Sequence, residues 1–293
     1  MVTQAEVLVF LEQKFSTIVD AKRKSLKREI QETVGYRELV IVFVKRYFST
    51  LYKQTVLGPA WIVINPLVTT LVFSVIFGNV AQLSTEGLPK PLFYMLGNTT
   101  WLLFSTTVLQ NASSFTSNSA IFSKVYFPRL VVSAATTIQS FLVYLIQFSV
   151  FILFLMGFLI AGFRPNLGAN WPLLFLLPVL MLVVSMLGVG IGLIISSLTT
   201  KYRDLNVLVA FAMQLWMYAT PIVYPLSELS QTLRKYIMFN PMSSIVEAFR
   251  FIILGEGSFS IPWLIYSAGF AVVTLIIGMR LFSRIEKTFV DTI

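Results

Sequence analysis

Six long stretches without a charged residue run through this sequence of 293 residues. They cover 54–85, 91–123, 130–163, 165–200, 205–227 and 257–279. A helix needs about 20 largely apolar residues to cross the hydrocarbon core of a membrane, so each stretch is long enough for one crossing. None has the polar turn near its middle that two crossings would need. The pattern predicts an all-α membrane protein whose six transmembrane helices, within residues 54–293, lie at about 58–80, 92–117, 132–160, 172–199, 205–224 and 262–280.

The composition excludes an ordinary cytosolic enzyme. Charged residues make up only 12% of the chain and hydrophobic residues 56%, whereas a soluble domain has about 25% charged residues. Cys and His are both absent, which removes disulfides, thiol nucleophiles, the commonest general base and the commonest metal ligand. We expect this chain to hold no metal and no cofactor.

Lys and Arg are unevenly distributed along the chain. If both termini are cytoplasmic, the inner segments are the N-terminus, 118–131, 200–204 and the C-terminus, and they hold 17 of the 22 basic residues. Cytoplasmic loops of membrane proteins carry such an excess. The sequence therefore predicts a multi-pass protein of the cell inner membrane with both termini in the cytoplasm. Its net charge of +9 needs no nucleic-acid partner to explain it.

The first 53 residues are predicted to stay outside the hydrocarbon core. Residues 1–35 form a basic cytoplasmic leader, which either lies near anionic lipid head groups or is simply solvated. Residues 36–53 form an amphipathic helix in the membrane interface. Its apolar arc contains Tyr36, Val40, Phe43, Val44, Tyr47, Phe48 and Leu51, and its polar arc contains Glu38, Lys45, Arg46, Ser49, Thr50 and Lys53. A seventh span here is disfavoured, because each charge at the bilayer centre costs about 2.5–3.5 kcal/mol.

Two segments between the spans have features beyond those of simple connectors. Residues 119–130, SAIFSKVYFPRL, combine basic and apolar side chains and predict a docking element on the inner side. The long outer segment 225–261 divides at Asn240–Pro241, where the proline forces a turn. Residues 226–254 are therefore predicted to form two re-entrant helices. Glu247 and Arg250 lie three residues apart on the second helix, so they can pair on one face.

What the six spans lack restricts the function. Apart from Arg280, the last residue of the sixth span, they contain no Asp, Glu, Lys, Arg or His, although proton-coupled carriers and pumps usually need such groups. The phosphate loop G-x-x-x-x-G-K-[ST] is also absent. We therefore expect a chain that is not an enzyme, that binds no nucleotide and that has no ATPase activity by itself.

Three motifs, in the right order, resemble the ABC-2 type permeases of polysaccharide export. They are YKQTVLGPAWIVINPLVTTLVFSVIFG at 52–78, SNSAIFSKVYFPRL at 117–130, and KYRDLNVLVAFAMQLWMYATPIVYP at 201–225 followed by FNPMSSIVEAFR at 239–250. The resemblance implies a homodimer that pairs with two copies of a separate cytoplasmic nucleotide-binding subunit, where ATP and Mg²⁺ are bound. It further implies export of a lipid-linked polysaccharide such as O-antigen, capsule or teichoic acid, carried on undecaprenyl diphosphate or another membrane lipid.

By motif position, the resemblance also assigns roles to particular residues. The coupling helix that would contact the partner ATPase lies within 119–129 and includes Ser119, Ile121, Phe122, Lys124, Val125, Tyr126, Phe127 and Arg129. Leu57 and Gly58 form the turn into the first span. The paired outer gate helices lie within 226–254 and include Asn240, Pro241, Glu247 and Arg250.

Charge and ring chemistry indicate how such a substrate would move. The anionic diphosphate would enter beside Lys45, Arg46 and Lys53, near Leu57 and Gly58, although contact with ordinary lipid phosphates explains these cations equally well. Aromatic faces stack on sugar rings, so an uncharged aromatic channel suits a sliding glycan. The candidates for lining it are Phe73, Phe77, Phe104, Gln110, Asn111, Phe115, Trp216 and Tyr218, and core packing is the alternative explanation for each aromatic residue among them.

Two other functions fit parts of the pattern. An ABC-2 exporter of drugs or lipids would share the motifs, and the VYFPR segment with the short outer helix pair favours the glycan branch. A membrane glycosyltransferase would need acidic residues in a cytoplasmic loop to bind a metal ion and a sugar nucleotide. Asp204 is the only acid in the inner loops, which disfavours that enzyme.

Overall fold

The computed structural model describes residues 26–53, 57–122, 125, 127–165, 168–199 and 204–289. These residues form helices joined by turns, and no strand occurs among them. The α-helices are α2 (Leu26–Gly35), α3 (Arg37–Tyr52), α4 (Ala60–Phe73), α5 (Lys90–Ala112), α6 (Ser114–Phe122), α7 (Leu130–Ile160), α8 (Leu177–Thr199), α9 (Leu205–Tyr218), α10 (Gln231–Met238), α11 (Pro241–Leu254) and α12 (Ile261–Phe289). A π-helical segment η1 (Ser74–Val80) extends α4, and η2 (Gly168–Leu176) and η3 (Leu226–Glu228) are 3₁₀-helical.

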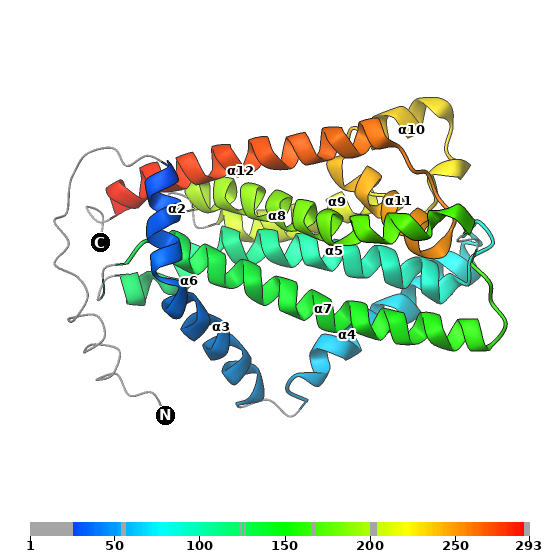
Figure 1. The fold of residues 1–293 in the computed structure, drawn as a ribbon, viewed down its shortest axis with the longest axis horizontal. Coiled ribbons are helices and arrows are strands. Elements are labelled where there is room, and N and C mark those ends of the chain that lie inside the picture. Colours follow the sequence, from blue (N-terminus) through cyan, green and yellow to red (C-terminus); the bar gives the residue numbers. More distant parts are fainter. Residues whose placement is uncertain are drawn as a thin grey trace.

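The long helices lie along the longest axis of the molecule, with α5 at their centre (Figure 1). α5 contacts α4, α7, α8, α9 and α11, and most of its side chains are buried. α2 crosses one end of the bundle beside the last turns of α12, where Ser283 Oγ donates to Glu29 Oε2. α10 and its corner with α11 lie at the opposite end. We call these two ends the N-terminal end and the distal end.

α5 is central although its sequence is polar for a membrane helix. Its hydroxyl groups donate to carbonyls of their own preceding turn, as from Thr99 to Met95 (2.9 Å) and from Thr107 to Leu103 (2.6 Å). The Asn111 side chain likewise donates to a backbone carbonyl in its own helix. Because α5 faces protein on nearly all sides, it can carry polar groups that would be costly on a lipid-facing helix.

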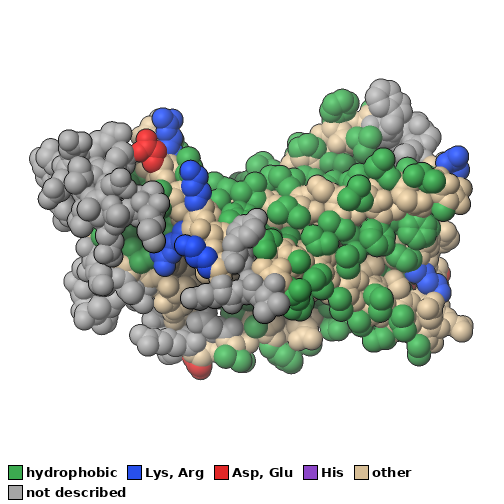
Figure 2. Space-filling view, turned by 90° about the horizontal axis from the view of Figure 1, so that it is seen from below, with side chains coloured by type: hydrophobic (Ala, Val, Ile, Leu, Met, Phe, Trp, Pro, Cys, Tyr) green, Lys and Arg blue, Asp and Glu red, His purple; other side chains and the backbone are tan. Residues whose placement is uncertain are grey.

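Four helical stretches are long and apolar enough to cross a membrane, namely Ala60–Val80, Leu130–Ile160, Pro172–Thr199 and Ile261–Arg284. The pair α10–α11, bent by 104°, adds a fifth if it counts as one broken span. Figure 2 shows a broad apolar band on one face, with the coloured charged side chains toward its two ends. The predicted all-helical, multi-pass membrane protein is therefore confirmed.

The predicted number of six spans is not confirmed, because α5 and α9 fall outside this set. α5 is too polar to be identified as a span by composition. α9 has 14 residues, which at 1.5 Å per residue make a helix of about 21 Å, shorter than the hydrocarbon core of about 30 Å. Both helices lie largely within predicted spans. The prediction and the structure therefore differ in the length of α9 and in the polarity of α5, and agree on where the helices are.

Several predicted boundaries also differ from the observed ones. The second predicted span, 92–117, ends as α5 at Ala112, and Ser113 separates it from α6. The fifth, 205–224, ends as α9 at Tyr218. Residues 26–35 of the predicted leader form α2, whereas residues 1–25 lie outside the described part of the chain.

The predicted coupling helix within 119–129 is not continuous. α6 ends at Phe122, and Val125, Phe127 and Pro128 are not helical. A proline disfavours helical backbone in the residue before it, so Pro128 explains why Phe127 is not helical. The docking element is therefore a short helix followed by an irregular segment.

α8 and α12 approach each other at glycines. A Cβ added to Gly190 would lie 2.5 Å from the backbone nitrogen of Leu275, and one added to Gly278 would lie 2.5 Å from the Gly190 carbonyl oxygen. Backbone atoms cannot yield as a flexible side chain can. Only glycine therefore allows this helix spacing, which brings favourable van der Waals packing inside a membrane.

We expect Gly190→Ala to push α12 away from α8 and to lower the thermal unfolding midpoint of the purified protein in detergent. Gly269→Ala is the matched control, because it lies on α12 and an added Cβ meets nothing within 4 Å. Alanine is favoured over glycine inside a helix by about 0.5–1 kcal/mol, so the control should not destabilise. Equal midpoints for the two variants, measured by circular dichroism, would contradict the crossing.

Candidate functional site

A fully buried ion pair lies at the distal end of the bundle. Arg250 Nη1 and Glu247 Oε1 are 2.7 Å apart, and neither side chain has any exposed surface. Both residues belong to α11, and all side chains from Pro241 to Arg250 are buried. The pairing predicted from their spacing of three residues is confirmed. Two charges without access to water require hydrogen bonds from their surroundings, so the neighbours of this pair are informative.

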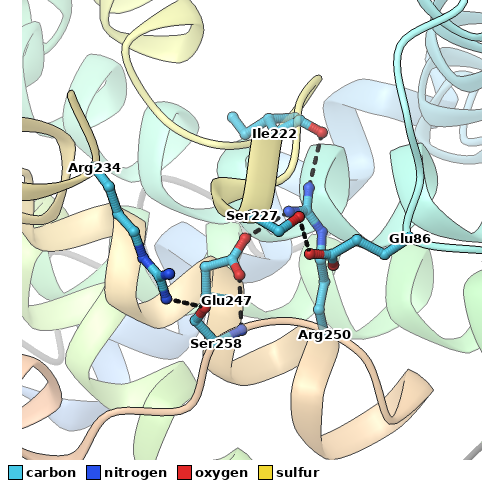
Figure 3. A network of polar contacts seen from close by, with 7 residues as sticks. All are labelled: Glu86, Ile222, Ser227, Arg234, Glu247, Arg250 and Ser258. Atoms are coloured by element: carbon cyan, nitrogen blue, oxygen red, sulfur yellow. Dashed lines mark hydrogen bonds and ion pairs between the residues drawn. The ribbon is translucent and has the colours of Figure 1, made fainter. Parts of the chain in front are cut away.

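The two partners bind segments far apart in the sequence (Figure 3). Arg250 Nη2 donates to the Ile222 carbonyl at 2.9 Å, and its Cζ lies 3.7 Å from the ring centroid of Phe93. Glu247 Oε2 accepts from the backbone nitrogen of Ser258 at 2.9 Å. The pair therefore connects α5, the segment after α9, α11 and the segment before α12 through charge-assisted bonds and a cation–π contact.

A second acid reaches the same region from the loop between α4 and α5. Glu86 Oε1 accepts from Ser227 Oγ of η3 at 2.6 Å, and Arg234 Nη2 of α10 donates to Ser258 Oγ at 2.6 Å. The sequence analysis did not identify Glu86 as a site residue. The sequence could have indicated it, because Glu86 is the only acidic residue between Glu38 and Asp204.

The corner between α10 and α11 lies at the predicted place. Asn240 is the N-cap residue of α11, and its Oδ1 accepts from the backbone nitrogen of Met242 at 3.1 Å. Pro241 occupies the first turn of the helix, where its missing N–H costs nothing. α10 and α11 meet at Asn240–Pro241, where the turn was predicted, whereas their re-entry into the membrane and their action as a gate stay predictions.

Most described residues of the coupling segment pack inside the chain itself. Phe127 is buried, and its ring centroid lies 5.9 Å from that of Phe43 in α3. Arg129 is also buried, with its guanidinium 5.4 Å from the ring centroid of Phe122. Ile121, Phe122 and Val125 pack against the same apolar cluster as Phe127. The placement of Lys124 and Tyr126 and the side chain of Ser119 lie outside the described residues.

The cations predicted to meet the lipid diphosphate lie on the outside of the molecule. Lys45, Arg46 and Lys53 are exposed, as is Leu57. Gly58 is buried with a φ of 46°, which is the left-handed backbone that glycine adopts without strain. The amphipathic helix is observed as α3, with its apolar side packed on α7 and its cations facing outward.

Three of the predicted channel residues are in the protein interior. Phe104, Asn111 and Phe115 are fully buried, so they line no open passage in this conformation. Phe104 contacts the Trp216 ring at 5.2 Å, Phe115 stacks on Phe282 at 4.3 Å, and Asn111 accepts a hydrogen bond from Ser133. Core packing, the alternative given for the aromatic residues, therefore holds for both phenylalanines.

The other channel candidates have different degrees of exposure. Phe73 is buried and contacts the Phe77 ring at 5.4 Å. Phe77, Gln110 and Trp216 are half-buried, and Tyr218 is 43% exposed. Tyr218 is thus the one member of the predicted set with a largely accessible side chain, and it lies at the last residue of α9.

The sequence analysis also missed two exposed polar residues on apolar helices. Asn65 of α4 and Gln214 of α9 both have exposed side chains. Such side chains are costly against lipid and are usually found at helix contacts or beside a polar passage. Among the described residues, no three acidic side chains gather closely enough to hold a metal ion.

We expect removal of one member of the buried ion pair to destabilise the protein more than removal of both. Glu247→Ala or Arg250→Ala alone strands a buried charge, at a cost of about 3–5 kcal/mol, whereas the double variant does not. The pair of Arg28 and Glu32 on α2, 3.7 Å apart with side chains 63% and 29% exposed, is the control, because pairs with access to solvent contribute about 0–1 kcal/mol. Denaturation in detergent measures the four variants of each pair. Additive losses at Glu247 and Arg250 would contradict the coupling.

Several known membrane proteins are similar to this chain in sequence. A family model described as ABC-2 type transporter matches residues 38–254. An O-antigen export system permease protein (RfbA) of Klebsiella pneumoniae is 26% identical over 265 residues, which cover 90% of this chain and 98% of the relative. Its namesake in Myxococcus xanthus is 27% identical over 269 residues, covering 91% and 99%. The polysialic acid transport protein KpsM of Escherichia coli is 24% identical over 247 residues, covering 84% and 93%.

The family match begins in α3 and ends with α11, so it includes the interfacial helix, the coupling segment and the buried ion pair. It covers well over half of the chain, and the motifs found in the sequence lie within or overlap it. The chain therefore belongs to the ABC-2 type transporter family.

Proposed function

We propose that this chain is the membrane permease of an ABC exporter that carries a lipid-linked polysaccharide, similar to O-antigen, across the cytoplasmic membrane. The observation that carries the proposal is the match to O-antigen export permeases over about nine-tenths of this chain and nearly the whole of each relative. A match limited to one shared span would support only a membrane location. A match over the whole length instead supports a shared membrane topology and a shared class of exported substrate.

ATP is bound and hydrolysed by a separate cytoplasmic subunit, present in two copies. The absence of a phosphate loop from the sequence supports this division of labour. The N-terminal end faces that subunit and presents the predicted coupling segment, residues 119–129. Because Phe127 and Arg129 are buried within the chain, contact with the ATPase falls on other residues of the segment, for which Lys124, Tyr126 and Ser119 are the candidates.

The lipid diphosphate enters at the inner leaflet beside α3. Lys45, Arg46 and Lys53 are exposed there and are free to attract an anionic head group. The turn at Leu57 and Gly58 connects this basic surface with the start of α4. Attraction of ordinary lipid phosphates uses the same three cations, so this surface gathers anionic lipids in general and the diphosphate carrier among them.

The permease works as a homodimer, with the glycan passing between the two copies. Exposed Asn65 and Gln214 support this arrangement, because a polar side chain on a membrane helix favours a protein or water neighbour over lipid. Tyr218 offers an aromatic face at the distal end of α9, where it can stack on a sugar ring. Phe77, Gln110 and Trp216 extend this lining once the helices separate.

α10 and α11 close the exit at the outer side of the membrane. Every described side chain of α11 from Pro241 to Arg250 is buried, and the Glu247–Arg250 pair joins it to neighbouring segments. This supports a closed conformation in which the distal end is sealed by protein contacts. Opening then requires that these contacts rearrange while the pair stays intact or becomes hydrated.

Deletion of the chain in its own host tests the proposed cargo. We expect surface glycan to disappear and lipid-linked glycan to accumulate inside, because synthesis continues while export stops. Surface labelling of intact cells and extraction of lipid-linked glycan measure the two pools, and re-expression of the unchanged chain is the control. Normal surface glycan combined with loss of a drug-efflux or lipid-export phenotype would favour the drug or lipid exporter instead.

A further inference from the structure

One side chain at the distal end uses its whole hydrogen-bonding capacity to connect two helices. Asn240 Oδ1 accepts from Trp216 Nε1 at 3.0 Å and from the backbone nitrogen of Met242 at 3.1 Å. Its Nδ2 donates to Thr220 Oγ1 at 2.8 Å and to the Ala219 carbonyl at 3.2 Å. An amide side chain offers two donor and two acceptor positions, so Asn240 has none to spare.

These bonds close two helix ends at once. Asn240 begins α11 as its N-cap, and the Ala219 carbonyl that it binds follows the last residue of α9. Carbonyls at a helix C-terminus have no partner within the helix and need one from elsewhere. The side chains of Tyr218, the last residue of α9, and of Ala219 are exposed, whereas Thr220 and Ile222 just beyond them are buried. Asn240, which is half-buried, therefore supplies a partner for the Ala219 carbonyl at the edge of the buried region.

The connection continues into the central helix. The Trp216 ring lies 5.2 Å from Phe104 and 6.5 Å from Trp101, both buried residues of α5. Thr220 Oγ1 also donates to the Trp216 carbonyl at 2.9 Å. The outer end of α9 is thus held on one side by rings of α5 and on the other by a single amide at the corner of α10 and α11.

We propose that Asn240 is a positioning residue that makes the outer end of α9 and the corner of the α10–α11 pair move as one unit. This inference rests on the proposed export function, in which α9 borders the passage and α10–α11 close it. If α9 moved without the corner, the Asn240 amide, the Trp216 indole N–H and the Ala219 carbonyl would all lose their partners at once, and the part-buried groups among them would pay for lost hydrogen bonds. Displacement of α9 therefore carries the corner with it.

We call the four hydrogen bonds of the Asn240 side chain the Asn240 joint. Distances between spin labels test this joint in the permease assembled with its ATPase. The chain has no native cysteine, so Phe211→Cys on α9 and Tyr236→Cys on α10 give one label pair, and Phe211→Cys with Val273→Cys on α12 gives another. All three positions are exposed. Labelled chains are diluted with unlabelled ones so that only distances within one chain are measured. Trapping with ATP and vanadate should change the α9–α12 distance and leave the α9–α10 distance narrow and unchanged.

Three substitutions weaken the joint to different extents. Asn240→Ala removes all four bonds, Trp216→Phe removes the indole N–H and keeps an aromatic ring, and Thr220→Val removes one hydroxyl. Trp61→Phe, at an exposed tryptophan of α4, and Thr106→Val, whose hydroxyl binds within α5, are the matched controls. We expect Asn240→Ala and the double variant Trp216→Phe with Thr220→Val to broaden the α9–α10 distance. Export should fall about fivefold or more while ATP hydrolysis continues, as for loss of coupling between two sites.

The possible results distinguish a failure of the inference about Asn240 from a failure of the proposed export function. A narrow α9–α10 distance in both Asn240→Ala and the double variant, with nucleotide and without it, would overturn the joint. If Asn240→Ala does not fold, the double variant decides, because it keeps the aromatic ring at 216 and a branched side chain at 220. If nucleotide changes no distance in the unsubstituted chain while the variants still broaden the α9–α10 distance, the joint stands and ATP-driven export is wrong.

Discussion

A guanidinium group without exposed surface is stable in a membrane protein only where its charge is paired and its N–H groups have partners. Arg250 meets most of this condition through Glu247, the Ile222 carbonyl and the face of Phe93, whereas its Nε has no hydrogen-bond partner among the described residues. Those partners come from three separate parts of the chain, so the distal end cannot come apart without exposing the charge to an apolar environment. The constraint gives α11 a defined position against α5, the segment after α9 and the segment before α12.

The rest of the bundle follows from how the helices divide between lipid and protein. α4, α7, α8 and α12 carry the apolar surface that lipid demands, and α5 fills the centre, where its hydroxyls bind its own carbonyls. At the N-terminal end, α3 packs on the segment around Phe127. A displacement of that segment would therefore be felt by α3 and by the start of α7, which share its apolar cluster.

The sequence predicted the parts of this structure that follow from local pattern. Charge-free stretches located the helices, the Asn240–Pro241 dipeptide located the corner, and a spacing of three residues predicted the pairing of Glu247 with Arg250. Contacts between distant segments were not predictable in this way. Local sequence does not predict that Glu86 lies beside η3 or that Phe127 is buried against α3. It also does not predict that α9 ends at Tyr218, just before the carbonyl that Asn240 binds. Each of these features depends on which segments meet after folding.

The central claim is that α10 and α11 form a closed exit, with one helix outside the seal and the other inside it. Single cysteines introduced along 231–250, except at 247 and 250, and treated with a membrane-impermeant thiol reagent test it most directly. The side chains of 231–236 are exposed and those of 241–250 are buried, so the account predicts reaction on α10 and protection on α11. Equal reaction along both helices would mean a solvated loop and would contradict a closed exit.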